Sequence, residues 1–177
     1  MSGFDPFTLG GKSYDFDHLK PLTLRVSPDD KPGTKVLAIL VNFSCHCFTE
    51  GYDPSRPELT YIHAGETRSF DKLRYALSLN LHSIIRVIPD KKVLFTRETN
   101  YLIAETIDHS GQNVKYTIFF DLKKARDRWN DLVMTVESAY IKEALPKHLD
   151  KIRFKILAGK VAGGHKVLSP QHFQKRK

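Results

Sequence analysis

Residues 69–89 restrict the fold of this chain more than any other segment. Their apolar side chains recur at three- and four-residue spacing, which places them on one side of an α-helix. These side chains are Phe70, Leu73, Leu77, Leu81, Ile84, Ile85 and Ile88. Ser69 can cap the start of the helix, and Pro89 stops it. The spacing therefore predicts a main helix over about residues 70–88 with one face for packing on a sheet.

After Pro89 the apolar residues alternate with polar ones, which is the pattern of half-buried strands. It predicts strands at residues 93–97, 101–107, 115–122 and 132–140. A tight turn at residues 109–112 and a longer connection at residues 125–130 make these strands an antiparallel meander. Residues 22–26 and 35–48 are also extended, and the turn-rich residues 28–33 join them as a hairpin, so strands begin the chain.

The 177 residues, of which 41% are hydrophobic, are enough for one domain with a sizeable core. We predict an α+β fold: a single domain with N-terminal strands and one main helix (about 70–88) packed on a curled antiparallel β-meander (about 92–141). The domain is expected to span residues 1–168. Residues 169–177 are expected to form a basic, mobile tail.

The positive charge of the chain lies at its C-terminal end. Lys and Arg number 28 against 20 Asp and Glu, and the whole net charge of +8 falls within residues 151–177, which contain no acidic residue. A basic end on a neutral body predicts an acidic partner, and nucleic acid is favoured, RNA over DNA. Arg153, Lys155, Lys160 and Lys166 would then contact the phosphate backbone. An acidic protein, such as an antitoxin, and a merely solvated tail are the alternatives.

Several classes of partner and cofactor are not expected. No run of 18 apolar residues occurs, so we expect no membrane partner and a cytoplasmic protein. On a strand, Cys45 and Cys47 would point their thiols to one face, too far apart for an easy disulfide. Cys45-His46-Cys47 lacks the second ligand pair that structural zinc needs, and no glycine-rich loop cradles a phosphate, so neither a metal nor another cofactor is expected.

Histidines and cations supply the candidate catalytic residues. Strand alternation places His46 opposite the apolar row, beside Ser44 and Asn42, and His46 or His82 is the candidate proton carrier. Arg97 or Lys115 would hold a phosphate, and Ser138 and Tyr140 would orient it. Together such groups suffice to cleave RNA through its own 2′-hydroxyl without a metal.

Arg68 and Arg74 stand at the predicted helix start. They would bind a phosphate there, or they would simply pair with Glu66 and Asp71.

A helix packed on a curled sheet, with strands Lys115-Tyr116-Thr117-Ile118-Phe119-Phe120 and Val136-Glu137-Ser138-Ala139-Tyr140, resembles the barnase/EndoU/colicin/RelE-like group of small metal-independent ribonucleases. Many of these are toxins or mobile-element proteins. The resemblance covers roughly residues 67–158. It implies RNA cleavage by acid–base chemistry, with Ser138 and Tyr140 at matching positions of a late strand. The chain departs from the group in its own N-terminal strands and in having His82 as the one histidine of the main helix.

Two other classes of function remain open on the sequence. One is a non-catalytic nucleic-acid-binding protein in which Tyr75, Tyr101 or Trp129 stacks on bases. The other is a phage or plasmid protein–protein interaction module or inhibitor, whose basic end meets an acidic protein surface. The first predicts salt-sensitive RNA binding without turnover, and the second predicts no RNA affinity once charge is screened.

Overall fold

The computed structural model describes residues 3–29, 31, 33–96, 101–109, 111–142, 144, 149–165 and 167, excepting the side chains of residues 108 and 109. Its strands are β1 (Phe7–Leu9), β2 (Lys12–Tyr14), β3 (Leu22–Val26), β4 (Leu37–Phe43), β5 (Thr49–Glu50), β6 (Thr60–His63), β7 (Glu66–Phe70), β8 (Lys92–Phe95), β9 (Tyr101–His109), β10 (Gln112–Lys124), β11 (Leu132–Ile141) and β12 (Lys151–Arg153). Its α-helices are α1 (Lys72–Ser78), α2 (Leu81–Arg86) and α3 (Phe154–Ala162). Short 3₁₀ turns are η1 (Asp17–Leu19), η2 (Cys45–Cys47), η3 (Pro57–Leu59) and η4 (Ile88–Asp90).

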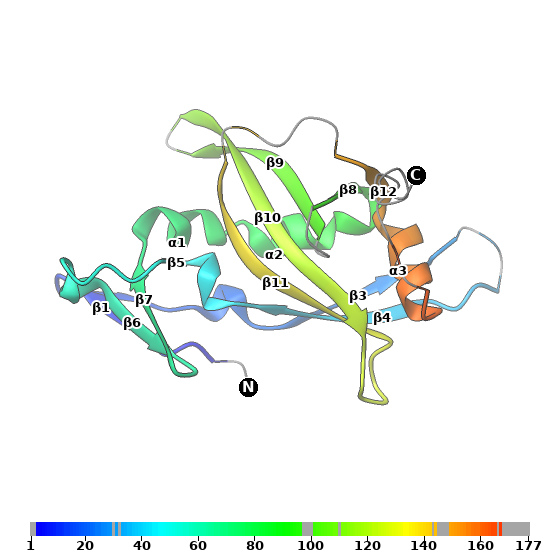
Figure 1. The fold of residues 1–177 in the computed structure, drawn as a ribbon, viewed down its shortest axis with the longest axis horizontal. Helices are drawn as coiled ribbons and strands as arrows, with labels where there is room; N and C mark the ends of the chain where they lie inside the picture. Colours follow the sequence, from blue (N-terminus) through cyan, green and yellow to red (C-terminus); the bar gives the residue numbers. More distant parts are fainter. Residues whose placement is uncertain are drawn as a thin grey trace, which may run out of the picture.

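A seven-stranded sheet in the order β12-β8-β9-β10-β11-β4-β3 dominates the molecule (Figure 1). The predicted meander β8–β11 and the β3–β4 hairpin are antiparallel, as expected. The sheet as a whole is mixed, because β4 pairs in parallel with β11. Smaller sheets of order β5-β7-β6 and β1-β2 lie to one side. The fold is thus the predicted single α+β domain, with one parallel pairing that the sequence pattern did not indicate.

The two faces of the large sheet differ in burial. On the inner face Ile118 and Phe120 of β10 are fully buried, whereas Phe119 and Asp121, on the outer face, keep part of their surface exposed. Helix α2 lies behind β10 and β11 in Figure 1, α1 lies to the left of them near β7, and α3 packs its Phe154 ring 6.1 Å from the ring of Phe120. Burying each such side chain contributes about 1.5–3 kcal/mol.

The predicted helix over residues 70–88 is two short helices, α1 and α2, separated at Leu79 and Asn80. Polar side chains compete for the carbonyl groups there, since Ser78 Oγ donates to Tyr75 O (2.7 Å) and Asn80 Nδ2 donates to Leu77 O (3.2 Å). The backbone N–H of Asn80 also bonds Leu77 O, three residues back rather than four. Leu73, expected on the packing face, is exposed, but Phe70, Leu77, Leu81, Ile84, Ile85 and Ile88 are buried. The apolar face otherwise continues across the break, which is why its periodicity resembles one helix.

Two local boundaries differ from the expected ones. Asp71, not Ser69, caps α1, and its carboxylate accepts from the backbone N–H groups of Leu73 (2.8 Å) and Arg74 (3.0 Å). Strand β4 ends at Phe43, and Cys45–Cys47 form η2 instead of continuing the strand. Arg97, Lys166 and the predicted tail at residues 169–177 lie outside the described residues. No helix in the described part of the chain is long and apolar enough to cross a membrane.

Candidate active site

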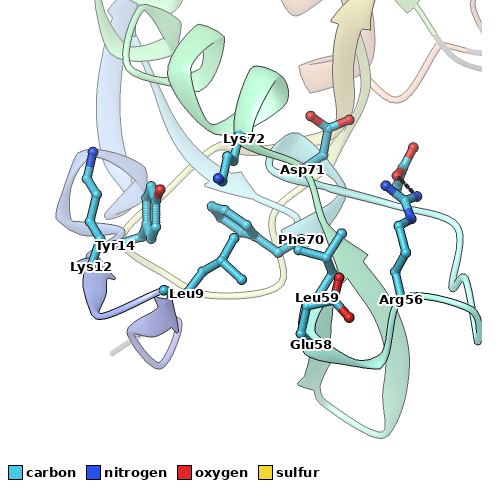
Figure 2. Close-up of a pocket in the computed structure, with 11 residues that line it drawn as sticks. Leu9, Lys12, Tyr14, Arg56, Glu58, Leu59, Phe70, Asp71 and Lys72 are labelled. Carbon is cyan, nitrogen blue, oxygen red and sulfur yellow. Dashed lines mark hydrogen bonds and ion pairs between the residues drawn. The ribbon is translucent and has the colours of Figure 1, made fainter.

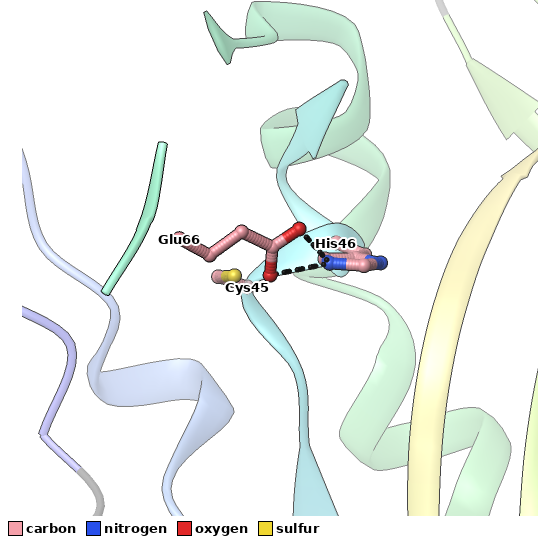
Figure 3. Close-up of side chains that lie close together, drawn as sticks. All are labelled: Cys45, His46 and Glu66. Carbon is pink, nitrogen blue, oxygen red and sulfur yellow. Dashed lines mark hydrogen bonds and ion pairs between the residues drawn. The ribbon is translucent and has the colours of Figure 1, made fainter. Parts of the chain in front are cut away.

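His46 and Glu66 form the first element of the site. The η2 turn fixes His46, whose backbone N–H donates to Ser44 Oγ (3.2 Å), and its Nε2 lies 3.0 Å from both carboxylate oxygens of Glu66 (Figure 3). The bond from His46, with a second from Arg68, holds the pKa of Glu66 below its ordinary value. Because an ionised carboxylate only accepts, Nε2 carries the proton, and Nδ1 of the neutral ring is the basic nitrogen. No hydrogen bond among the described residues occupies Nδ1, and 34% of the His46 side chain is exposed.

Two arginines stand beside this pair, and Thr49 anchors both. Arg68 Nε donates to Thr49 Oγ1 (2.7 Å), and its Nη1 donates to Glu66 Oε1 (2.9 Å). Arg74 Nη1 donates to the backbone oxygens of Thr49 (2.7 Å) and His46 (3.4 Å). Their side chains are 15% and 22% exposed, and among the described residues Nη2 of each has no hydrogen-bond partner. The two guanidinium groups are therefore fixed in place with donors left for an anion.

The guanidinium of Arg74 also links the site to the outer face of the sheet. Its carbon lies 5.0 Å from the ring centre of Tyr140, whose ring stacks on Phe119 (5.4 Å between centres, 21° between planes). Lys142 Nζ lies 5.5 Å from the Phe119 ring. Cations and aromatic rings thus alternate here, which is the composition of a surface that stacks on bases and holds phosphates. We call His46, Thr49, Glu66, Arg68, Arg74 and Tyr140 the polar cluster.

A β-bulge decides which β11 side chains reach the outer face. Ser138 pairs with Phe119 but Val136 pairs with Phe120, so Glu137 is the extra residue of β11. Beyond it, Ser138 and Tyr140 share the face of their partners Phe119 and Thr117. Lys115, exposed and two residues before Thr117 on β10, lies on the same face.

The structure thus brings half of the twelve predicted residues together. His46, Arg68, Arg74 and Tyr140 meet in the polar cluster, and Lys115 and Ser138 share the adjoining face. The alternative pairing of the arginines is also present, since Arg68 contacts Glu66 and Arg74 Nε lies 3.7 Å from Asp71 Oδ2. The anion site predicted at the helix start is not formed, because Asp71 already occupies the first N–H groups of the seven-residue α1.

The other predicted residues lie apart. His82 Nε2 donates to the backbone oxygen of Lys20 (2.9 Å), and its ring stacks on Phe43. Its contacts are therefore with residues outside the polar cluster. The exposed Arg153 and Lys160, with half-buried Lys155, belong to β12 and α3, and α3 covers the inner face. Arg97 and Lys166 lie outside the described residues.

Of the aromatics proposed for base stacking, Tyr101 is buried. Tyr75 packs among Tyr14, Phe16 and Phe70. Trp129 is 74% exposed.

A pocket of about 670 Å³ lies where β7 ends and α1 begins (Figure 2). It is lined by Leu9, Gly10, Lys12, Tyr14, Glu50, Arg56, Glu58, Leu59, Phe70, Asp71 and Lys72. Three of its six charged residues are engaged, since Arg56 pairs with Glu50 (2.8 Å) and with Asp53 beside the pocket (2.7 Å), and Asp71 caps α1. We therefore place the candidate chemistry at the polar cluster, where an accessible imidazole stands beside two fixed arginines.

Sequence reasoning missed Glu66 as the partner of His46, and it missed Phe119 and Lys142. Glu66 begins β7, 20 residues after His46 in the η2 turn, and no local pattern indicates that pairing. Phe119 was assigned to a strand, and only the cross-strand register reveals it as the neighbour of Ser138 and Tyr140. Strand alternation carries the signal that was missed, because it places Phe119 on the same face as the polar residues Lys115, Thr117 and Asp121.

The two cysteines of η2 are both buried. Burial raises the pKa of the Cys47 thiol to about 12, and it lies 3.8 Å from the backbone oxygen of Val136. Such a thiol is inert toward solvent. The expectation that both thiols share a strand face is wrong, because the strand has already ended at Phe43.

Comparison with known proteins gives one relationship. No curated protein and no solved structure matches the chain. The family model that does match is described as the YjaZ family and covers residues 6–162, which include all the sheet strands, the polar cluster and α3. Because the match spans most of the sequence, the chain belongs to the YjaZ family.

Proposed function

We propose that this protein acts on RNA in the cytoplasm as a metal-independent endoribonuclease of toxin or mobile-element type. One observation carries the proposal: an accessible imidazole, oriented by a carboxylate, stands beside two anchored arginines and a half-exposed tyrosine. The barnase/EndoU/colicin/RelE-like resemblance of the sequence points to the same chemistry. The partner is RNA rather than DNA because the reaction uses the 2′-hydroxyl.

In the proposed reaction Nδ1 of His46 takes the proton of the 2′-hydroxyl. The 2′-oxygen attacks phosphorus, the bond from phosphorus to the 5′-oxygen breaks, and water supplies the proton to the leaving 5′-oxygen. Glu66 stabilises the imidazolium that forms. Arg68 and Arg74 face the charge that develops on the phosphoryl oxygens, and the Tyr140 hydroxyl orients one of them. The products are a 2′,3′-cyclic phosphate and a 5′-hydroxyl end.

The outer face next to the cluster suits a single strand of RNA. Phe119 and Tyr140 offer rings on which bases stack, each stack contributing about 1–3 kcal/mol. Lys115 and Lys142 add phosphate contacts along the same face. The basic end on α3 covers the other side of the sheet, so we assign it only salt-sensitive, sequence-independent attraction of the strand.

The test is cleavage of labelled single-stranded RNA in EDTA, with a matched strand carrying 2′-deoxyribose at every position. The proposal predicts cleavage of the RNA alone, cyclic phosphate ends, and a loss of about 10²–10⁴-fold in His46→Ala. His82→Gln keeps a donor for Lys20 O and serves as the matched control, with activity unchanged. Salt-sensitive binding without any cleavage would instead establish the non-catalytic binding protein, and neither binding nor cleavage would leave an acidic protein as the partner.

A further inference from the structure

Three potential metal ligands converge on the η2 turn. Sγ of Cys45, an imidazole nitrogen of His46 and a carboxylate oxygen of Glu66 all lie within 4.8 Å of one another (Figure 3). Cys45 and His46 are consecutive residues held by η2, and Glu66 reaches them from the start of β7. Cys47, which completes the Cys45-His46-Cys47 run of the sequence, is not part of this group, and Glu66 takes its place.

The donor set matches zinc among the common divalent ions. Thiolate sulfur and imidazole nitrogen select zinc over magnesium or calcium, and carboxylate oxygen completes three ligands with a fourth position open to water. Bond lengths of about 2.0–2.3 Å in a tetrahedron separate neighbouring ligand atoms by about 3.5 Å. Cys45 is buried and fixed, whereas the side chains of His46 and Glu66 are 34% and 48% exposed and have room to close by the remaining ångström.

The surroundings of the three ligands are compatible with an ion. Glu66 Oε1 accepts from Arg68 Nη1 at 2.9 Å, so the guanidinium can stay on that oxygen as an outer partner while Oε2 binds the ion. One thiolate and one carboxylate offset the two charges of the ion, and Arg68 then gives the site a net charge of about +1.

We propose that Cys45, His46 and Glu66 bind one zinc ion, with water as the fourth ligand. On binding, the Sγ–H bond of Cys45 breaks, its proton leaves to solvent, and an Sγ–zinc bond forms, with no change of oxidation state. The zinc site does not depend on the proposed RNA cleavage, which uses His46 in its metal-free form.

Cobalt(II) tests the site directly, because a cobalt–thiolate bond gives a charge-transfer absorption band in the near ultraviolet that neither imidazole nor carboxylate produces. Titration of the metal-free, reduced full chain should give this band at one cobalt per chain, and zinc should abolish it by displacement. Native mass spectrometry of the zinc-loaded chain should show one retained ion.

Four variants locate the ligands. Cys45→Ser should lose the band, and Glu66→Gln should weaken cobalt binding by more than the roughly 10–100-fold that loss of an outer-shell partner costs. Cys47→Ala and His63→Gln, each close in sequence to a proposed ligand but outside the group, should keep the band. Glu66 is half exposed, so its variant tests the site even where Cys45→Ser does not fold by circular dichroism. Absence of the band in the unaltered chain, its persistence in Cys45→Ser, or unchanged affinity in Glu66→Gln would overturn the proposal.

Discussion

Replacing Tyr116 by Phe should stabilise this protein. The Tyr116 side chain is fully buried on the inner face of β10, and its hydroxyl has no hydrogen-bond partner within the described part of the chain. Burial also raises the pKa of this phenol, an effect that nearby Cys47 strengthens. The hydroxyl therefore gave up its bonds to water on folding without receiving others in exchange.

The expected size follows from that loss. A buried, unsatisfied hydroxyl costs about 1–3 kcal/mol, and Phe removes the oxygen while keeping the ring in place. Allowing for a few lost van der Waals contacts, we expect Tyr116→Phe to raise the free energy of unfolding by about 1–2 kcal/mol. For a chain of this length each kcal/mol shifts the melting temperature by about 2–4 °C, so the melting temperature should rise by about 2–8 °C.

Urea denaturation followed by circular dichroism measures the change, with the dependence on urea concentration unchanged between the two proteins. Tyr61→Phe is the matched control, because the Tyr61 hydroxyl donates to the backbone oxygen of Asp5 at 3.2 Å. That variant should lose about 0.5–1.5 kcal/mol. A Tyr116→Phe protein less stable than the unaltered chain would refute the reasoning, because it would mean that the hydroxyl is bonded after all.

Three further predictions concern the cluster and its surroundings. Arg74→Lys should lower the free energy of unfolding, measured by urea titration, by about 1–2 kcal/mol. The reason is that one ammonium cannot reach Thr49 O and Asp71 while covering the Tyr140 ring. An unchanged free energy of unfolding would mean that these contacts are not formed together. Above neutral pH, stability should begin to fall at about pH 9, because burial raises the pKa of Cys45 above 9.0, that of Cys47 from 9.0 to about 12 and that of Tyr61 from 10.0 to about 12, so the unfolded chain ionises first. Cys47→Ala should make the fall in urea-measured stability between pH 9 and 12 shallower, and an unchanged slope would exclude this thiol as a cause. If RNA cleavage and zinc binding both occur, zinc should inhibit cleavage and EDTA should restore it, whereas cleavage assays unaffected by saturating zinc would mean that the ion and the base use different histidines.

The sequence predicted which segments form helices and strands better than it predicted where each of them begins and ends. Alternation and helical spacing depend on burial, which is the same in one long helix and in two short ones that share a face, so the break at Asn80 left no mark on the apolar pattern. The end of β4 at Phe43 was hidden in the same way, because Cys45 and Cys47 are buried in a turn just as they would be on a strand.

The sequence predicted only those site residues that can be recognised one at a time, by residue type and position. His46, Arg74 and Tyr140 drew notice by residue type and place, but their meeting depends on two long-range pairings. Strand β4 adds to β11 in parallel, with Val136 opposite Phe43, and β7 brings Glu66 to η2. Neither pairing has a local sequence signature, since partners so far apart are selected by the packing of the whole core.

The extra residue at Glu137 changes which residue numbers of β11 face outward, odd before the bulge and even after it. Before it, even-numbered residues such as Met134 and Val136 point into the core; after it the buried position is Ala139. Deleting Glu137 would remove the bulge and leave strict alternation, with Val136 and Ala139 still facing the core and Ser138 and Tyr140 still facing outward. In related sequences, single-residue gaps at this point of β11 should therefore be compatible with the aromatic surface, as should substitutions of Glu137 itself.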